Sequence, residues 1–424
     1  MRRSLVALLV VGLGVVAWRA TIVPTPEAER PADVTVFGPW LGADADAFVE
    51  SVDRSGSPAV VRYTGTGDLE RDLRRRVERG VDLPDLAVVP QAGLVADLAE
   101  AGRLVPFSEE VTASIVGSRA RPAASLDRDG RARALPYRTT VKSLLWYRPE
   151  VFAEHGWSPP ATLDELHSLV AEIQATDGIA PWCFGTFSGS ASGWPATDWI
   201  EDLVLRRLGP EAYDEWASGA RPFDDPGVRA AFEELAELVL EGDRVAGGRS
   251  AVLDRELAQV AAGLFADDGG CALLKQADFA ATWFPDGTTV GPDGDVDVVA
   301  LPGVDEGAAP LVQGGDVIVQ LTARADLDPL LAFLAAPEGA AAWAERGGFV
   351  SDRDDVDPAT SYAAGSQPIV ELLVADRTRR PDASEGFHAT FRDVYHAGLV
   401  DWIAGTITLD DLLPLLDEAR ATAG

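Results

Sequence analysis

A chain of 424 residues exceeds the size at which a single hydrophobic core usually keeps growing, so we expect two lobes. Hydrophobic residues make up 47% of the chain and charged residues 25%, which excludes a disordered or fibrous protein. The 68 acidic and 36 basic side chains give a formal net charge of −32. Because a surface of that sign repels phosphate backbones, we expect no nucleic-acid partner.

The first residues have the pattern of an export signal. Arg2 and Arg3 precede an apolar run from Leu5 to Ala17, and a proline-containing stretch follows. We therefore predict a signal peptide or an uncleaved N-terminal anchor at residues 1–20 and a linker at residues 21–32. Either form places the protein outside the cell or at the cell surface. No cysteine follows the apolar run, so the sequence does not support a lipid anchor.

Short apolar strands alternate with helical patterns over the first hundred residues. The predicted strands are Val34–Phe37, Val60–Tyr63 and Leu86–Val89, and the predicted helices are Ala43–Val52, Leu69–Arg79 and Leu94–Ala99. Such alternation predicts a largely parallel sheet. Asp68 stands directly before the second helix, where it can act as an N-cap.

The stretch from Leu144 to Leu166 carries the clearest local signals in the chain. A strand at Leu144–Tyr147 precedes a helix at Pro149–His155, which Gly156 ends. Thr162 and Glu165 have the spacing of a capping box. Further helices are predicted from apolar spacing at Leu163–Ala175, Trp199–Leu208, Val228–Glu241, Leu253–Ala262 and Asp410–Ala421.

Several of these segments resemble one protein family. After Leu144 the chain has, in order, an aromatic pair, Phe-x-x-x-Gly, Pro-Pro, Thr and an acidic residue. Residues 68–107 have the order helix, Pro-Asp, strand and helix. Both orders resemble the extracellular (family 1) solute-binding proteins of carbohydrate ABC importers. The sequences KSLLWY at 142–147 and GWPATDW at 193–199 are closest to the binding proteins for α-glucosides, maltose and trehalose.

The resemblance implies an α/β fold with two lobes, the periplasmic-binding-protein-like (type II) fold. Each lobe would be a mainly parallel sheet flanked by helices, with a ligand cleft between the lobes. The implied crossings at Ala134–Thr139, Val296–Pro302 and Gly347–Val350 divide the chain. The first lobe would hold residues 33–139 and 296–346, and the second lobe residues 140–295 and 347–424.

The resemblance also implies the function of an extracellular substrate-binding component of an ABC transporter. Such a protein closes a hinge around a small carbohydrate and delivers it to the transmembrane permease, as a monomer and without a cofactor. Two alternatives remain open, a ligand-binding accessory of a sensor system and a glycoside hydrolase. We find no nucleophile motif, cofactor loop or metal motif. The four histidines are dispersed, and we expect surface positions for them: His155, His167, His388 and His396.

A sugar site needs aromatic platforms beside planar hydrogen-bonding groups. The densest such segment is Pro181–Asp202, which includes Trp194 and Asp198. From this segment, the ends of the strands and the resemblance, the candidate ligand-binding residues are Trp40, Asp68, Gln91, Tyr137, Ser188, Trp194, Asp198, Gln276, Trp283, Gly315, Asp316 and Phe387. For many of these an ordinary structural role is the alternative: helix capping for Asp68 and Asp198, a turn for Gly315, and core packing for the weaker aromatic candidates.

The chain contains two cysteines and two lysines. In an exported protein Cys183 and Cys271 favour a single disulfide, with two buried free thiols as the alternative. Lys142 and Lys275 both fall in segments that match the sugar-binding family, and in a chain that otherwise uses arginine this placement suggests a local need for an ammonium group.

Overall fold

The computed structural model describes residues 33–56, 60–118, 130–266, 270–351 and 353–423. The predicted signal or anchor at 1–20 and the linker at 21–32 lie outside these residues. None of the helices in the described ranges has the length and apolar character that a membrane crossing requires.

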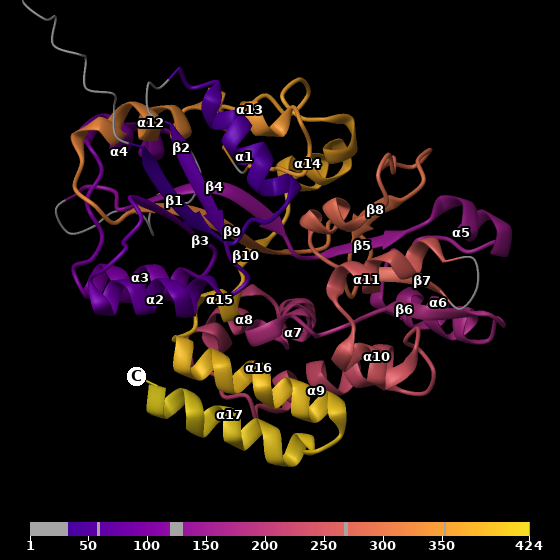
Figure 1. Ribbon diagram of the computed structural model, residues 1–424. Helices are drawn as coiled ribbons and strands as arrows, with labels where there is room; N and C mark the ends of the chain where they lie inside the picture. The colour runs from indigo at the N-terminus through magenta and orange to yellow at the C-terminus, as the bar shows by residue number, and fades with distance from the viewer. Residues whose placement is uncertain (1–32, 57–59, 119–129, 267–269, 352, 424) are drawn as a thin grey trace, which may run out of the picture.

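A six-stranded sheet forms the first lobe (Figure 1). Its order is β10-β9-β3-β1-β2, and β4 also pairs with β9. The strands are β1 (Val34–Gly38), β2 (Val61–Gly65), β3 (Leu86–Val89), β4 (Ala134–Val141), β9 (Leu311–Gln320) and β10 (Arg379–Pro381). The helices that accompany them are α1 (Ala43–Asp53), α2 (Leu69–Arg79), α3 (Ala92–Glu100), α4 (Glu109–Gly117), α12 (Asp328–Leu334), α13 (Pro337–Ala344) and α14 (Gln367–Val374), with the 3₁₀ segments η6 (Ala325–Leu327) and η7 (Ala364–Ser366).

Alternation along the strands buries both faces of this sheet. Val34 and Val36 of β1 belong to the core beneath α1, α4, α12 and α13, whereas Phe37 belongs to the core beneath α2 and α3. Successive side chains of a strand point to opposite faces, so each strand supplies both cores. The three strands predicted near the N-terminus are present and pair in parallel, as the alternation indicates.

A four-stranded sheet with the order β6-β7-β5-β8 forms the second lobe. Its strands are β5 (Leu144–Tyr147), β6 (Ile179–Cys183), β7 (Gly270–Lys275) and β8 (Asp297–Ala300). Its helices are α5 (Pro149–His155), α6 (Leu163–Gln174), α7 (Trp194–Leu208), α8 (Pro210–Ala217), α9 (Pro226–Leu235), α10 (Gly248–Asp254), α11 (Leu257–Ala261), α15 (Ala383–Gly386), α16 (Ala389–Ala404) and α17 (Leu409–Ala423). Short segments are η2 (Gly189–Ala191), the π turn η3 (Ala236–Leu240), η4 (Ala262–Phe265) and η5 (Asp278–Trp283).

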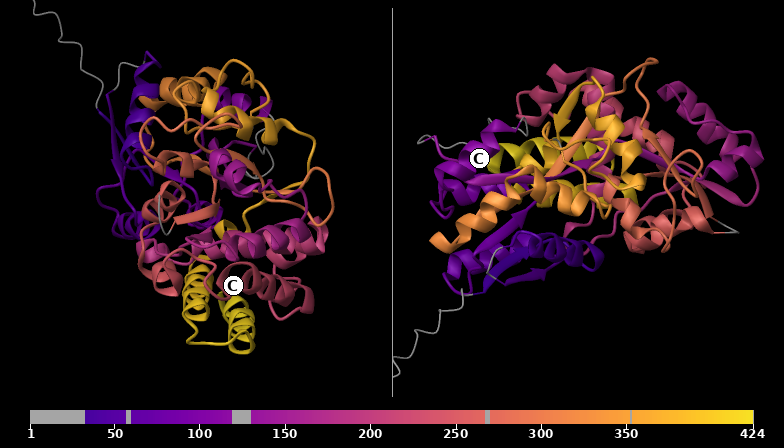
Figure 2. Two further views of the ribbon diagram at one scale, coloured as in Figure 1. Left: turned by 90° about the vertical axis from the view of Figure 1, so that its right-hand side faces the viewer. Right: turned by 90° about the horizontal axis from the view of Figure 1, so that it is seen from above.

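The C-terminal helices α16 and α17 lie side by side at one end of the second lobe (Figure 2). They complete the core that Trp199 of α7 and Leu273 of β7 share with Leu412 of α17. The predicted C-terminal helix at 410–421 is therefore present, one residue longer at its start and two at its end.

The structure corrects three predictions about the sheets. In the second lobe β5 runs antiparallel to both β7 and β8, so this sheet is mixed rather than mainly parallel. The run that includes β8, predicted to cross back into the first lobe, instead pairs with β5 and buries Val298. Conversely β10, predicted in the second lobe, pairs with β9 of the first.

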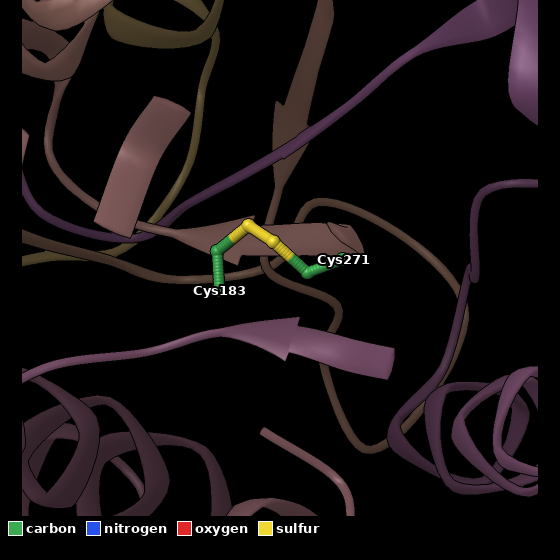
Figure 3. The surroundings of a disulfide bond; sticks show 2 residues. All are labelled: Cys183 and Cys271. Carbon is green, nitrogen blue, oxygen red and sulfur yellow. A yellow bond between two sulfur atoms is a disulfide. The ribbon is translucent and has the colours of Figure 1, made fainter. Parts of the chain in front are cut away.

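A disulfide between Cys183 and Cys271 joins the neighbouring strands β6 and β7 (Figure 3). Both cysteines are buried. The link closes a sequence separation of 88 residues and ties the start of β7 to the strand that leads toward α7. Of the two alternatives that the sequence left open for these cysteines, the structure contains the disulfide.

Candidate functional site

A cleft of about 1140 Å³ lies where the two lobes meet. The residues that line it from the first lobe include Trp40, Asp44, Asp68, Glu70, Gln91, Arg138 and Asp316. Those from the second lobe and from the segments joining the lobes include Lys142, Ser188, Ser190, Trp194, Asp198, Phe279, Trp283, Asp382, Glu385, Arg392 and His396. The structure thus brings eight of the twelve candidate residues to one cleft: Trp40, Asp68, Gln91, Ser188, Trp194, Asp198, Trp283 and Asp316.

The floor of the cleft is built around Lys142. This residue follows β4 directly and stands between the first-lobe strand and β5, so the chain crossing places it at the junction of the lobes. Its Nζ atom lies 3.0 Å from Asp382, 3.3 Å from Glu385 and 3.4 Å from Asp198. One ammonium group therefore faces three carboxylates.

Two helix starts hold these carboxylates in place. Helix α7 begins at Trp194, because Gly193 adopts a left-handed φ of 112° and Pro195 fits the first turn, and this sets Asp198 on the second turn. Asp382 caps α15, where its carboxylate accepts hydrogen bonds from the amide of Glu385 and the hydroxyl of Ser384.

Glu201 locks the two helix starts together. It lies one turn after Asp198 and is fully buried, and its carboxylate accepts hydrogen bonds from the amides of Ala383 at 2.8 Å and Ser384 at 3.1 Å. The hydroxyl of Tyr213 donates to the same group at 3.1 Å. The geometry of the floor is therefore fixed from behind by Glu201 and Tyr213, which do not line the cleft.

The pKa values of the three floor carboxylates differ, because burial raises them and the single ammonium lowers them to different extents. Burial raises the pKa of Asp198 to about 6, although Lys142 acts in the opposite direction. Burial and the nearby Asp382 charge raise the pKa of Glu385 well above its usual value. Burial would also raise the pKa of Asp382, but Lys142 and the hydrogen bonds of the α15 start hold it below its usual value. Asp382 therefore stays ionised to lower pH than the other two carboxylates, and Asp198 takes up a proton as the pH falls through about 6.

Three aromatic rings form a row along the second-lobe wall. The ring of Phe279 lies 5.9 Å from that of Trp194 and 5.3 Å from that of Trp283, between ring centroids. The Lys142 ammonium lies 5.3 Å from the Trp194 ring centroid, so the row reaches the charged floor. Flat apolar faces beside carboxylates are the combination that a polyhydroxylated ring requires.

The first-lobe wall contains a hydrogen bond between a tryptophan and an aspartate. The indole nitrogen of Trp40 donates to Asp316 at 2.9 Å, and its ring packs against Tyr63 and Trp343. Trp40 is buried, so it holds the wall in place and presents little free ring face. Arg138 binds Asp44 at 3.0 Å on the same side.

At the mouth of the cleft the lobes contact each other directly. Asp68 accepts a hydrogen bond from Ser190 of the second lobe, and Glu70 pairs with Arg392 of α16. Asp68 stands at the N-cap position of α2 as predicted, but its side chain makes no capping bond there, so the capping role itself is wrong. The predicted alternative for Asp198 is wrong as well, since α7 begins at Trp194 and not at Trp199.

Four candidate residues lie outside the cleft lining. Tyr137 packs in the first-lobe core and Phe387 in the second-lobe core, against Phe391 and Trp216. The Gln276 side chain accepts a hydrogen bond from the Ala277 amide. Gly315 is not in a turn but inside β9, where its Cβ would lie 2.5 Å from the Arg138 carbonyl oxygen.

The sequence prediction missed several lining residues. Phe279 completes the aromatic row, and Glu385 and Asp382 come from a segment that carried no local signal. His396 is buried against the cleft and is not the surface residue that we predicted. Burial and the nearby Arg392 lower the pKa of His396 to about 4, so its imidazole is neutral.

Comparison with known proteins agrees with this architecture. Residues 38–344 match the family model described as bacterial extracellular solute-binding protein. The alpha-glucosides-binding periplasmic protein AglE of Rhizobium meliloti (strain 1021) is 32% identical over 396 residues, which cover 89% of this chain and 84% of that protein. The osmoprotective compounds-binding protein GgtB of Synechocystis sp. is 31% identical, over 89% of this chain and 90% of its own.

Solved structures share the fold at low sequence identity. The bacterial solute receptor AcbH has a TM-score of 0.74 at 17% identity, over 92% of this chain and 98% of that one. Maltose-bound MalE3 of T. maritima has a TM-score of 0.71 at 18% identity, over 92% and 100% of the two chains. At these identities the likeness establishes the two-lobe fold.

Proposed function

This chain belongs to the bacterial extracellular solute-binding proteins, and we propose that it is the sugar receptor of an ABC importer. It binds an α-glucoside or a related oligosaccharide outside the cell, closes around it and delivers it to the permease. The name of AglE, and the KSLLWY and GWPATDW segments, support a ligand of this class.

One observation carries the proposal. The cleft places the row of rings formed by Trp194, Phe279 and Trp283 beside the floor that Lys142, Asp198 and Glu385 form. The rings suit the apolar faces of a sugar, and the floor offers both donors and acceptors for its hydroxyls. Because the lining comes from both lobes, a bound sugar favours the closed arrangement through its contacts to each side.

Calorimetric titration of the purified protein with maltose and trehalose tests the proposal. We expect micromolar or tighter binding of at least one such glucoside. Heat with a peptide or a polyamine and none with the sugars would overturn it. The sugar recovered from the complex should be chemically unchanged, whereas release of shortened products would favour a glycoside hydrolase.

We propose further that the protein is exported, remains at the cell surface or outside the cell, and acts as a monomer. Cell fractionation and size-exclusion chromatography test these two points. Adjacent genes for a permease and an ATPase would support import, whereas an adjacent sensor kinase gene would support a role in signalling.

A further inference from the structure

Strand β4 carries a bulge where it passes the cleft. Its register against β9 shifts between Pro136 and Arg138, opposite Val317 and Asp316, and the next pair is Thr139 with Gly315. Gly315 has a φ of 156°, and a side chain there would meet the Arg138 carbonyl oxygen. Bulges of this kind redirect a side chain, and here the redirected residue lines the cleft.

The guanidinium of Arg138 is bonded at one end only. Its Nη1 atom donates to Asp44 at 3.0 Å, and its carbon lies 5.3 Å from the ring centroid of Trp343. Within the described ranges Nε and Nη2 have no hydrogen-bond partner, although the residue is only 4% exposed. Buried donors are almost always paired, so two unpaired ones on a cleft residue indicate a missing partner.

The position of the two free donors specifies what can bind them. The N–H groups of Nε and Nη2 lie on the same edge of the planar guanidinium and point in parallel. Such an edge accommodates two oxygen atoms held side by side, as on neighbouring carbons of a sugar ring. A lysine ammonium, which is a compact charge without a fixed fork, cannot reproduce this arrangement.

The surrounding charges determine the kind of oxygen pair. The carboxylates of Asp44, Asp278 and Asp316 all act on the Arg138 charge. One guanidinium among three carboxylates leaves no surplus positive charge for an acidic ligand. Two neutral hydroxyl oxygens therefore suit the site better than a ligand carboxylate.

We propose that Arg138 is a specificity-determining residue that binds two neighbouring hydroxyl oxygens of one sugar ring through its Nε and Nη2 edge and disfavours acidic sugars. This inference rests on the proposed sugar-binding function. It adds a contact on the first-lobe wall to the aromatic row and charged floor of the second.

Calorimetry with maltose and its complete set of monodeoxy analogues tests the assignment. With the wild-type protein, two analogues that lack hydroxyls on adjacent carbons should each bind about tenfold more weakly than maltose. Arg138→Lys should bind maltose about tenfold more weakly and should no longer distinguish those two analogues from maltose. A maltose derivative oxidised to a uronic acid should bind the wild type about tenfold more weakly than maltose.

Arg353→Lys is the matched control, because Arg353 is also buried in the first lobe but binds Asp355 and the Ala335 carbonyl away from the cleft. It should keep the wild-type affinities for maltose and its analogues.

An Arg138→Lys variant that retains the wild-type selectivity among the analogues would overturn the inference, since water would then be the partner of the Nε and Nη2 donors. If Arg138→Lys does not fold, the affinities of the wild-type protein for the analogues still test the inference. If no two analogues that lack hydroxyls on adjacent carbons bind more weakly than maltose, Arg138 does not make the proposed contact. Failure of the wild type to bind any sugar would instead remove the proposed function, and the inference with it.

Discussion

Replacing Lys142 by methionine removes the ammonium of the cleft floor while filling most of the same volume. Three carboxylates lie 3.0 to 3.4 Å from that ammonium and then all lose their positively charged partner: Asp198, Asp382 and Glu385. The side chains of Lys142, Asp198 and Asp382 are at most 7% exposed and that of Glu385 is 20% exposed, so water replaces the lost partner only in part. Removing one partner of a buried ion pair costs about 3–5 kcal/mol, and we expect a loss of that size in the free energy of unfolding at pH 7.5.

The loss should depend on pH in a definite direction. Without Lys142 the pKa values of Asp198 and Glu385 rise further above their unfolded values, and the pKa of Asp382 also rises because Lys142 no longer lowers it. The folded variant then binds more protons than the unfolded chain, so its stability increases as the pH falls through the raised pKa values. At pH 5 the carboxylates take up protons in place of the ammonium, and the deficit relative to wild type should be clearly smaller.

Urea unfolding at the two pH values measures both effects, and Lys275→Met is the matched control. Lys275 is equally buried and pairs with Asp202 at 2.8 Å, but Asp202 keeps Arg206 and the Ser143 hydroxyl as partners. The control should therefore lose less stability and show a weaker pH dependence. Equal losses for Lys142→Met at pH 5 and pH 7.5 would refute the assignment of a shared ammonium.

Three further outcomes follow from the site. Asp198→Ala should weaken sugar binding by more than about 1 kcal/mol in calorimetry, because a desolvated hydroxyl loses its acceptor; unchanged affinity would remove Asp198 from the contact set. Because hydroxyl donors need the ionised carboxylate and the pKa of Asp198 is raised to about 6, wild-type affinity should fall as the pH drops below about 6, and binding near pH 6 should release protons. A flat affinity from pH 5 to pH 7.5 would contradict this. Replacing Cys183 and Cys271 by serine should lower the free energy of unfolding by about 4.6 kcal/mol, given the 88-residue separation, and an unchanged urea midpoint would show that the disulfide contributes nothing.

Local signals in the sequence predicted the elements well. Pro149 begins α5, Gly156 ends it with a φ of 73°, and the Thr162 hydroxyl caps α6 by accepting from the Glu165 amide. These features depend on residues a few positions apart, so they can be predicted from the local sequence. The predicted helix at Trp199–Leu208 starts five residues too late, because Gly193 already allows α7 to begin at Trp194.

Pairings between distant segments could not be predicted in the same way. Nothing near Val298 distinguishes a crossing strand from one that pairs with β5, since both are short apolar runs. The partners of Lys142 were equally hidden, because Asp382 and Glu385 lie more than two hundred residues further along the chain. The sequence marked the lysine as unusual, but the reason for it exists only in the folded arrangement.

The position of the charged floor bears on how the lobes close. Lys142 follows β4 and Asp382 follows β10, so both groups stand where the chain passes between the lobes and can stay together as the mouth opens. At the mouth, the Glu70–Arg392 pair and the Asp68–Ser190 bond join the lobes; the Arg392 and Glu70 side chains are only 8% and 16% exposed, and the desolvation of such a pair offsets much of its attraction, so its net contribution to closure is small. These contacts alone shift the equilibrium between open and closed forms only modestly, since a tenfold change in population needs about 1.4 kcal/mol. A ligand that bridges the first-lobe wall and the aromatic row must therefore supply most of the free energy that holds the protein closed.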